Sequence, residues 1–286
     1  MKNFLAASLA FILFAAVPAR AQQERWDARL AAVSGDVTVI AADGSPEVSG
    51  EAGLPLEEGD RVVVAEGASA EVALDGGSLI TVREKSDFKI EKTEKADASF
   101  FLSVGSLLAK IQKLSGQRLR VRTPAAVAAV RGTEFGIEVE GENSHVGVFD
   151  EGKVEVSGGV GGPPELLISN QETSVAKGHA PGHAAQLKRF IARRSQMRGQ
   201  GRRLAAIRSK WKVLPPDRRR EMRGKVMERM RDHRKRLIEK RSVLKQNVEI
   251  RRNQNGERGR QRHQENLRKM EERRKNINRG GRRERK

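Results

Sequence analysis

Few residues of this chain have the type and spacing to bind or transform another molecule, and the clearest is Arg131 in the triplet Arg131-Gly132-Thr133. An arginine beside a turn can hold a carboxylate or a phosphate through two parallel hydrogen bonds. Alternatively, Arg131 pairs with an acidic residue of the same chain, while Gly132 permits the chain to reverse direction. We favour the second interpretation and expect the triplet to be structural.

The histidines do not form a predicted metal site. His179 and His183 have the four-residue spacing of a helical metal pair, but Pro181 and Gly182 between them prevent the helix. The isolated histidines, expected at the surface, are His145, His233 and His263. The absence of cysteine excludes thiolate zinc sites and cysteine nucleophiles, and no hydrolase or nucleotide-binding motif is present. We therefore predict no enzyme activity, no catalytic residue, no metal and no cofactor.

The stretch from Val121 to Val139, VRTPAAVAAVRGTEFGIEV, indicates two strands joined by a tight turn. In its second part Phe135, Ile137 and Val139 alternate with glutamates, the two-residue period of a half-buried strand. In its first part, Ala125 to Ala129 present small or branched apolar residues on both faces, as a central strand requires.

Similar short apolar runs recur about every eight to twelve residues between glycine-rich turns, the spacing typical of an all-β domain. The candidate strands are Val37–Ile40, Arg61–Val64, Ala70–Leu74, Leu79–Val82, Phe88–Ile90, Phe100–Val104, Leu107–Ile111, Leu119–Val121, Phe135–Val139, Val146–Phe149 and Val154–Val156. We predict a β-sandwich or a β-solenoid of many short strands. Asp150-Glu151-Gly152 is expected to form a hairpin turn with positive φ at Gly152, and Leu166–Ile168 with Thr173–Val175 a last hairpin.

The order of these motifs resembles the FecR domain family. The motifs are TP followed by small residues, RGTEF and EGKVEV, with VSGDVTV, LPLEEGDRV and GGSLITV upstream, so that the resemblance covers roughly Leu30 to Val156. It implies an all-β domain without enzyme activity. The structural motif residues that carry it are Thr123, Pro124, Arg131, Gly132, Thr133, Phe135 and Gly152.

Net charge divides the chain into two parts. Residues 1–184 contain 18 Lys/Arg and 26 Asp/Glu, a net charge of −8, whereas residues 185–286 contain 38 and 11, a net charge of +27. A change this abrupt indicates an acidic folded domain followed by a polycationic tail. Such a tail is expected to accumulate near anionic polymers.

The first residues predict export. Lys2 precedes the apolar run Phe4–Val17, and Ala19 and Ala21 are the small residues that signal peptidase requires. Fourteen helical residues cover about 21 Å, less than the ~30 Å hydrocarbon core. We therefore expect a signal peptide, cleavage after Ala21, no later membrane span, and a periplasmic or secreted protein. Without disulfides, its core must be stable through burial alone.

The basic part is predicted to be helical and partly disordered. Pro215-Pro216 divides it into helices over about Ala184–Val213 and about Asp217–Ile250, which we expect to pack as an antiparallel, coiled-coil-like hairpin. The proposed stripes are Leu187, Ile191, Leu204, Ile207, Trp211 and Leu214 on one helix, and Met222, Val226, Met230, Leu237, Leu244 and Val248 on the other. The predicted domains are a signal peptide (1–21), a FecR-like β domain (22–182), a basic helical hairpin (183–252) and a basic, largely disordered or helical tail (253–286).

Three functions remain open. The favoured one is an exported binding module whose β domain recognises a cell-envelope protein or glycan, while the tail binds an anionic glycan, lipopolysaccharide or anionic lipid surface. The second is a FecR-type component of transmembrane signalling in iron or sigma-factor regulation. Since only Met1-Lys2-Asn3 precede the apolar run, we expect it to lack an anti-sigma segment. The third is nucleic-acid binding by the tail, which export disfavours and which only Phe190 and Trp211 would support by stacking.

Overall fold

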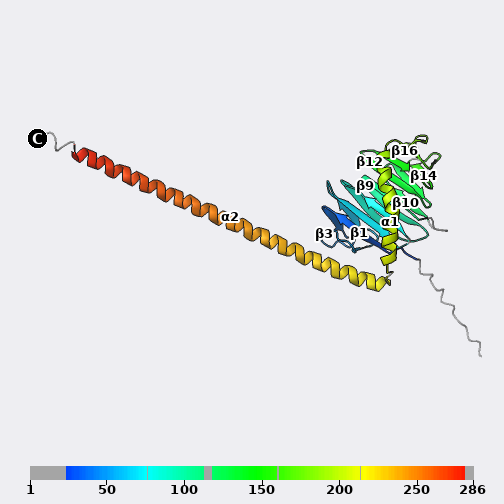
Figure 1. Ribbon diagram of the computed structural model, residues 1–286, viewed down its shortest axis with the longest axis horizontal. Coiled ribbons are helices and arrows are strands. Elements are labelled where there is room, and N and C mark those ends of the chain that lie inside the picture. Colours follow the sequence, from blue (N-terminus) through cyan, green and yellow to red (C-terminus); the bar gives the residue numbers. More distant parts are fainter. Residues whose placement is uncertain (1–23, 76, 113–117, 160, 213, 281–286) are drawn as a thin grey trace, which may run out of the picture. The chain divides into compact units, whose positions relative to one another are not determined.

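The computed structural model describes residues 24–75, 77–112, 118–159, 161–212 and 214–280. The predicted signal peptide, with Ala19 and Ala21, lies outside these residues. The chain forms two compact units that divide between Arg219 and Arg220. The first unit is a β-sandwich with a helical segment on one face, and the second unit is helical (Figure 1).

Two sheets form the sandwich, and they share strand β9 (Ala98–Lys110). The sheet that we call the open sheet has the order β3 (Val48–Ser49), β2 (Val37–Ile40), β5 (Arg61–Val64), β8 (Ser86–Lys92), β9, β10 (Leu119–Arg122), β11 (Ala126–Val130), β14 (Lys153–Gly158) and β15 (Glu165–Ile168). The sheet that we call the covered sheet has the order β4 (Pro55–Leu56), β1 (Ala28–Ser34), β6 (Ser69–Leu74), β7 (Ser78–Val82), β9, β12 (Glu134–Glu140), β13 (Asn143–Val148), β16 (Gln171–Ala176) and β17 (Ala185–Gln186). Among the described pairings, β9 with β10 is parallel and the others are antiparallel. The fold is therefore the predicted all-β domain, in its sandwich form.

Strand β9 turns the corner between the sheets at Gly105. Residues before Gly105 pair in the open sheet, and Gly105 to Lys110 pair in the covered sheet. Gly105 has a φ of 90°, and a Cβ atom there would lie 2.6 Å from the carbonyl oxygen of Lys85. Only glycine fits this position. The sequence prediction of two strands, Phe100–Val104 and Leu107–Ile111, is wrong because this glycine bends a strand without ending it.

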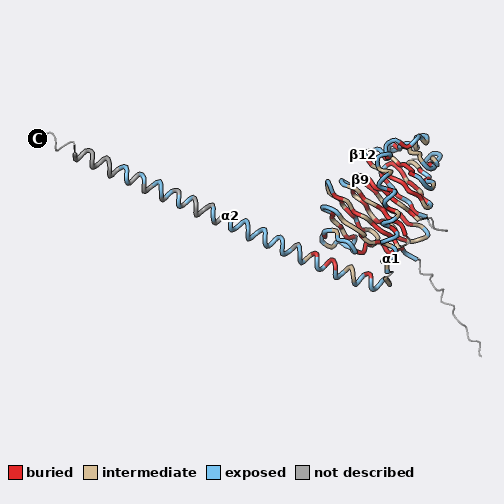
Figure 2. The backbone as a smooth tube through the Cα atoms, in the orientation of Figure 1, coloured by how far each residue is buried: buried red, intermediate tan, exposed pale blue. Residues whose placement is uncertain are grey.

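The burial patterns of the two sheets differ, because one sheet is covered on one face and the other on both faces. In the open sheet, β10 and β11 alternate buried residues with exposed or half-buried ones, because one face packs on the core and the other meets solvent. In the covered sheet, β7 and β12 are buried almost continuously, because both faces are covered. The core contains Phe88 stacked on Phe100, with ring centroids 5.4 Å apart. Figure 2 shows buried residues throughout the sandwich strands.

The hairpins of the second half alternate between the sheets. Strands β10 and β11 pair in the open sheet, β12 and β13 in the covered sheet, and β14 and β15 in the open sheet again. Asp150-Glu151-Gly152 therefore connects the two sheets, as Arg131-Gly132-Thr133 does, and neither is the predicted turn between paired strands. The predicted pairing of Leu166–Ile168 with Thr173–Val175 is also wrong, since β15 and β16 lie in different sheets.

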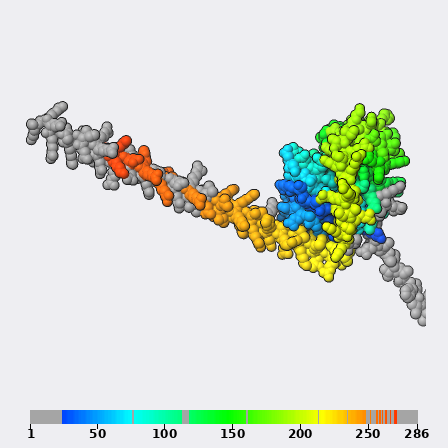
Figure 3. All heavy atoms as spheres, viewed as in Figure 1, coloured from blue at the N-terminus to red at the C-terminus, as the bar shows by residue number. Residues whose placement is uncertain are grey.

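Residues 185–212, here called the covering segment, lie over the outer face of the covered sheet. They comprise β17, a 3₁₀ turn (Ile191–Arg193) and helix α1 (Arg194–Lys210). Phe190 is fully buried, in edge-to-face contact with Phe149 at 6.3 Å between ring centroids. Gly136 and Gly147 make room for it, because a Cβ atom on either would lie within 2.8 Å of the Phe190 ring. Figures 1 and 3 show α1, in yellow-green, lying across the sandwich.

The C-terminal half of α1 continues this contact. Leu204 packs with Ala73 and Leu79 of the covered sheet, and Ile207 and Trp211 pack against the same cluster. The Arg29 guanidinium lies 4.5 Å from the centre of the Trp211 ring, a cation–π contact. The apolar side of α1 thus covers a sheet, whereas the sequence predicted that it would face a second helix.

The second unit consists of helix α2 (Pro216–Gly280) from Arg220 onward. Its 65 residues correspond to a helix roughly 98 Å long. The predicted end of this helix near Ile250 is wrong. The helix continues through Asn255, Gly256 and Gly259, residues of types that often end helices. Leu237 and Leu244, two residues of the proposed apolar stripe, are 46% and 67% exposed. Such exposure is typical of a helix that is polar on all sides. None of the described helices combines the length and hydrophobicity needed to cross a membrane.

Candidate functional site

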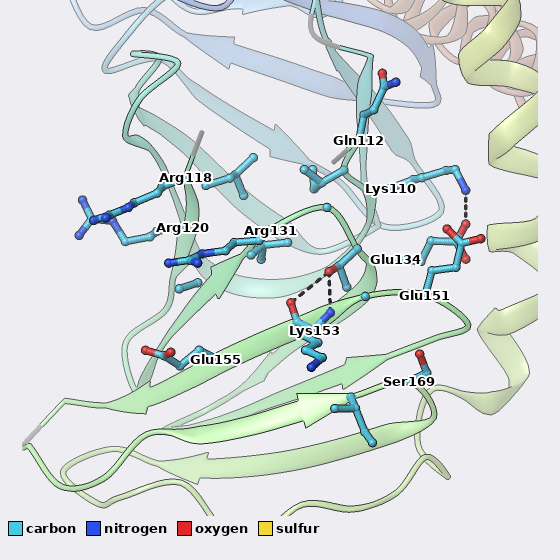
Figure 4. A pocket seen from close by; sticks show the side chains of 18 of the residues that line it. Lys110, Gln112, Arg118, Arg120, Arg131, Glu134, Glu151, Lys153, Glu155 and Ser169 are labelled. Carbon is cyan, nitrogen blue, oxygen red and sulfur yellow. Dashed lines mark hydrogen bonds and ion pairs between the residues drawn. The ribbon is translucent and has the colours of Figure 1, made fainter. Parts of the chain in front are cut away.

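A cavity of about 1300 Å³ opens at one end of the sandwich. Its lining includes Asp97, which precedes β9, and Lys110, the last residue of β9. Its walls come from β9, β10, β11, β14 and β15, from the two connections between the sheets, and from α1. Figure 4 shows Arg118, Arg120 and Arg131 on one side of this space and Lys110, Glu134 and Glu151 on the other. Residues 113–117, which link two lining residues, lie outside the described residues.

The lining is rich in charge, with basic residues in excess. The basic residues are Lys110, Arg118, Arg120, Arg131, Lys153 and Arg208, and the acidic residues are Asp97, Glu134, Glu151 and Glu155. Lys110 forms an ion pair with Glu134, and Arg120 donates to both carboxylate oxygens of Asp97, at 2.7 and 2.8 Å. Within the described part of the chain, the structure shows no ion pair for Arg118, Arg131 or Lys153.

Among the described residues, the structure does not show the internal ion pair that we expected for Arg131. Its side chain is exposed and lines the cavity, and it pairs with none of the described acidic residues. Gly132 has a φ of 74°, which agrees with the predicted chain reversal. Thr133 is the structural member of the triplet, because its hydroxyl bonds the backbone of Lys153 through both the N–H and the C=O, each at 3.1 Å.

Gly152 belongs to the second connection and packs against the first. Its φ is 96°, and a Cβ atom at this position would lie 2.6 Å from the carbonyl oxygen of Gly132. The positive φ predicted at Gly152 is thus present, although the turn connects two sheets. Glu134 N–H also donates to the Glu151 carbonyl at 3.2 Å, so the two connections are joined directly.

The remaining motif residues are structural and lie away from the cavity lining. The Thr123 hydroxyl accepts from Ala126 N–H at 2.8 Å and thereby closes the hairpin between β10 and β11. It also accepts from the Ser144 hydroxyl at 2.8 Å, which links the open sheet to the covered sheet. Pro124 is exposed in the turn, and Phe135 is fully buried.

Replacing Gly132 by valine should lower the free energy of unfolding by about 1–3 kcal/mol, because a β-branched residue is strained at positive φ. Thermal or denaturant unfolding of the full chain measures this change. Gly159→Val is the matched control, since Gly159 has open space around its Cβ position and no positive φ. Equal stability of the two variants would contradict the strain at Gly132.

A second charged surface joins the covering segment to the covered sheet. Arg189 and Arg193 both donate to Glu138, at 2.7 and 3.1 Å. Arg194 Nε donates to Asp150 at 2.7 Å. Burial alone would raise the pKa of Glu138, but the two arginines outweigh it and lower the pKa. The hydrogen bond from Arg194 lowers the pKa of Asp150. Arginines of the covering segment thus neutralise carboxylates of the β domain.

His145 is half-buried and partnered, in contrast to the predicted isolated surface residue. Its Nδ1 lies 2.7 Å from the Ser174 hydroxyl on the neighbouring strand, and its Nε2 lies 4.0 Å from Glu140. Burial lowers the pKa of His145 below 6.5, and the positive charge of Arg189 adds to this effect. The carboxylates of Glu140, Glu138 and Glu172 act in the opposite direction. Neither His145 nor Ser174 lines the cavity.

The folded protein should lose stability as the pH falls below about 6.5, in part because of His145. A lowered pKa means that the folded state binds fewer protons than the unfolded state, so protonation favours unfolding. The Hε1 resonance of His145, followed by NMR, should titrate below 6.5. His145→Asn should lose less stability between pH 7 and pH 5 than the parent chain does. A titration midpoint above 6.5 would reverse the sign and contradict this account.

The two histidines that are four residues apart in the sequence, His179 and His183, lie between β16 and β17. His179 and His183 are exposed, and His179 Nδ1 lies 3.1 Å from the carbonyl oxygen of Lys177. In the described part of the chain, no group of three or more His, Asp or Glu residues is arranged to hold a metal ion.

One family model matches part of the β domain. Residues 60–155 match the model of the FecR protein family. This part of the chain is a FecR domain. The match extends from β5 to β14 and includes the Arg131-Gly132-Thr133 connection and Gly152. Among curated proteins, none matches the chain.

Two crystal structures are similar to part of this chain. Both are of a "putative anti-sigma factor" from Parabacteroides distasonis ATCC 8503, at 1.65 and 2.50 Å resolution. Each shares 19% sequence identity with this chain at a TM-score of 0.41. The similarity covers 46% of this chain and 62% of the other, so it spans less than two thirds of that protein.

Proposed function

We propose that this chain is an exported, non-enzymatic binding module of the cell envelope. In this proposal the FecR domain recognises an envelope protein or glycan, and helix α2 binds an anionic polymer or lipid surface. The FecR match of residues 60–155 supports the first part, because the resemblance to this family implies an all-β domain without enzyme activity. The division of positive charge along the basic region supports the second part.

That division of charge is the observation on which the proposal depends. Residues 22–184 have a net charge of −10, and residues 185–219 have a net charge of +11, so together they are nearly neutral. Residues 220–286 contain 26 Lys/Arg against 10 Asp/Glu, a net charge of +16. The first group of cations is used inside the first unit, as the pairs of Arg189, Arg194 and Arg203 with its carboxylates show. The second group has too few acidic residues to neutralise it.

The exposure of the α2 side chains agrees with this division of charge. Every α2 side chain that the structure describes from residue 232 onward is exposed. An exposed helix with uncompensated cations attracts polyanions by counterion release, and this attraction does not depend on a particular sequence. An aromatic platform for bases is absent, since residues 220–286 contain no Phe, Trp or Tyr. We therefore favour an anionic envelope polymer or lipid over nucleic acid.

Removing residues 220–286 should abolish retention on immobilised heparin and on anionic lipid vesicles at physiological salt. The chain ending at Arg219 should keep its β-type circular dichroism spectrum and its cooperative unfolding. A full chain in which residues 220–286 are scrambled at constant composition should still be retained. Loss of binding on scrambling would instead indicate a specific partner. Retention of the chain ending at Arg219 would contradict the role of α2.

Signalling of the FecR type is the second candidate, and the family match of residues 60–155 is the observation that favours it. Deleting the gene should then change transcripts controlled by an envelope-responsive sigma factor, and the full chain should restore them. An unchanged transcriptome under iron limitation and envelope stress would exclude this candidate, whereas heparin retention would be unaffected.

A further inference from the structure

We propose that the cavity at the end of the sandwich binds an acidic peptide segment that also carries aliphatic side chains. This inference rests on the proposed binding function and names the class of partner that the FecR domain takes. The cavity belongs to the first unit alone, whereas the proposed binding of polyanions belongs to α2.

The positive side of the cavity comes from three elements. Arg118 precedes β10, Arg131 follows β11, and Lys153 begins β14. All three side chains are exposed, and none pairs with a described acidic residue. Guanidinium and ammonium groups with free donors at the edge of a cavity bind carboxylates. Of the four acidic lining residues, Glu134 pairs with Lys110 and Asp97 pairs with Arg120, so these two do not compete for the free cations.

The apolar side comes from β15. Leu166 and Ile168 line the cavity and are 52% and 46% exposed, unusual for aliphatic side chains of a strand. The strand register places Glu155 opposite Leu166 and Lys153 opposite Ile168. The pairing of β11 with β14 places the small Ala129 beside Glu155, and both residues line the cavity. A ligand lying there meets aliphatic surface on one side and cations on the other.

The chemistry of the lining favours a peptide over a glycan or a nucleic acid. None of the lining residues that the structure describes is aromatic, so sugar rings and bases find no ring to stack on there. Leu166 and Ile168 instead offer the aliphatic contact that leucine or valine side chains use. A volume of about 1300 Å³ is larger than the ~300–1,000 Å³ typical of small-molecule sites. An extended segment of several residues therefore fits better than a single metabolite.

A fluorescent decapeptide that alternates glutamate and leucine tests this site on the full chain at physiological salt. The double variant Arg131→Gln, Lys153→Gln should weaken binding by about tenfold or more, as expected for the loss of hydrogen bonds to charged groups. The matched control, Lys85→Gln with Lys177→Gln, removes two exposed lysines that pair with Glu66 and Glu142 away from the cavity. It should change the affinity less than about twofold.

Two further probes define the class of ligand. The Leu166→Ser variant should weaken binding of the glutamate–leucine peptide and leave a glutamate–glutamine peptide unchanged. An oligogalacturonate that binds more tightly than the peptide, and that depends on Arg131 and Lys153, would overturn the peptide assignment. Equal losses in the cavity variant and the lysine control would show that α2 alone attracts the peptide. That result would overturn the site and leave heparin retention intact.

Discussion

Phe190→Ala should lower the free energy of unfolding of the first unit by about 3–5 kcal/mol, the largest effect that we expect from one substitution. The Phe190 side chain is fully buried and contacts Phe149, Leu187 and the glycines at positions 136 and 147. Alanine would leave a cavity between the covering segment and the covered sheet, because glycines offer no side chain to fill it. Denaturant unfolding of the full chain measures the change.

Ile191→Ala is the matched control for this prediction. Ile191 follows Phe190 directly but is 57% exposed, so its truncation should cost less than about 1 kcal/mol. If both variants were equally stable, the covering segment would not be part of the folded unit. That outcome would also restore the domain boundary near Gly182 that the sequence predicted.

The predicted boundary near Gly182 shows that a change of net charge does not determine where a folded unit ends. The net charge of the sequence changes from negative to positive after residue 184. It does not mark the end of the first unit, since arginines of residues 185–219 pair with carboxylates of the β domain. A basic segment that neutralises an acidic domain has the same composition as one that binds elsewhere. Only the pairing with Glu138 and Asp150 distinguishes the two.

Strand positions could be predicted from the sequence, because the alternation of apolar residues is local. Val37–Ile40 and Arg61–Val64 coincide with β2 and β5. Strand partners could not be predicted in the same way, since a turn such as Asp150-Glu151-Gly152 has the same composition whether it joins paired strands or two sheets. The covered face of β12 could not be predicted either, because Phe135, Ile137 and Val139 alternate with glutamates in the sequence although the strand is buried almost continuously.

The candidate site was predicted only in part. Arg131 was singled out as a possible anion ligand, and then assigned to an internal pair that the structure does not show. Arg118, Lys153, Leu166 and Ile168 were missed, because they approach Arg131 only through the register of the open sheet. Sequence spacing carries no information about neighbours of that kind.

The second large effect concerns salt. Binding of the full chain to heparin should weaken by about a thousandfold or more between 50 and 200 mM salt, if six or more cations of α2 contact the polymer. Each contact releases a condensed counterion, so the affinity falls linearly with salt on logarithmic axes. The net charge of +16 on residues 220–286 is sufficient for this number of contacts.

This salt titration, performed in parallel on the full chain and on the chain ending at Arg219, tests the central claim most directly. We predict a steep slope for the full chain, and no measurable binding at any salt concentration for the shorter chain, because residues 22–219 have a net charge of only +1. The same steep slope in both chains, or salt-insensitive binding by the full chain, would contradict the division of charge between residues 185–219 and residues 220–286.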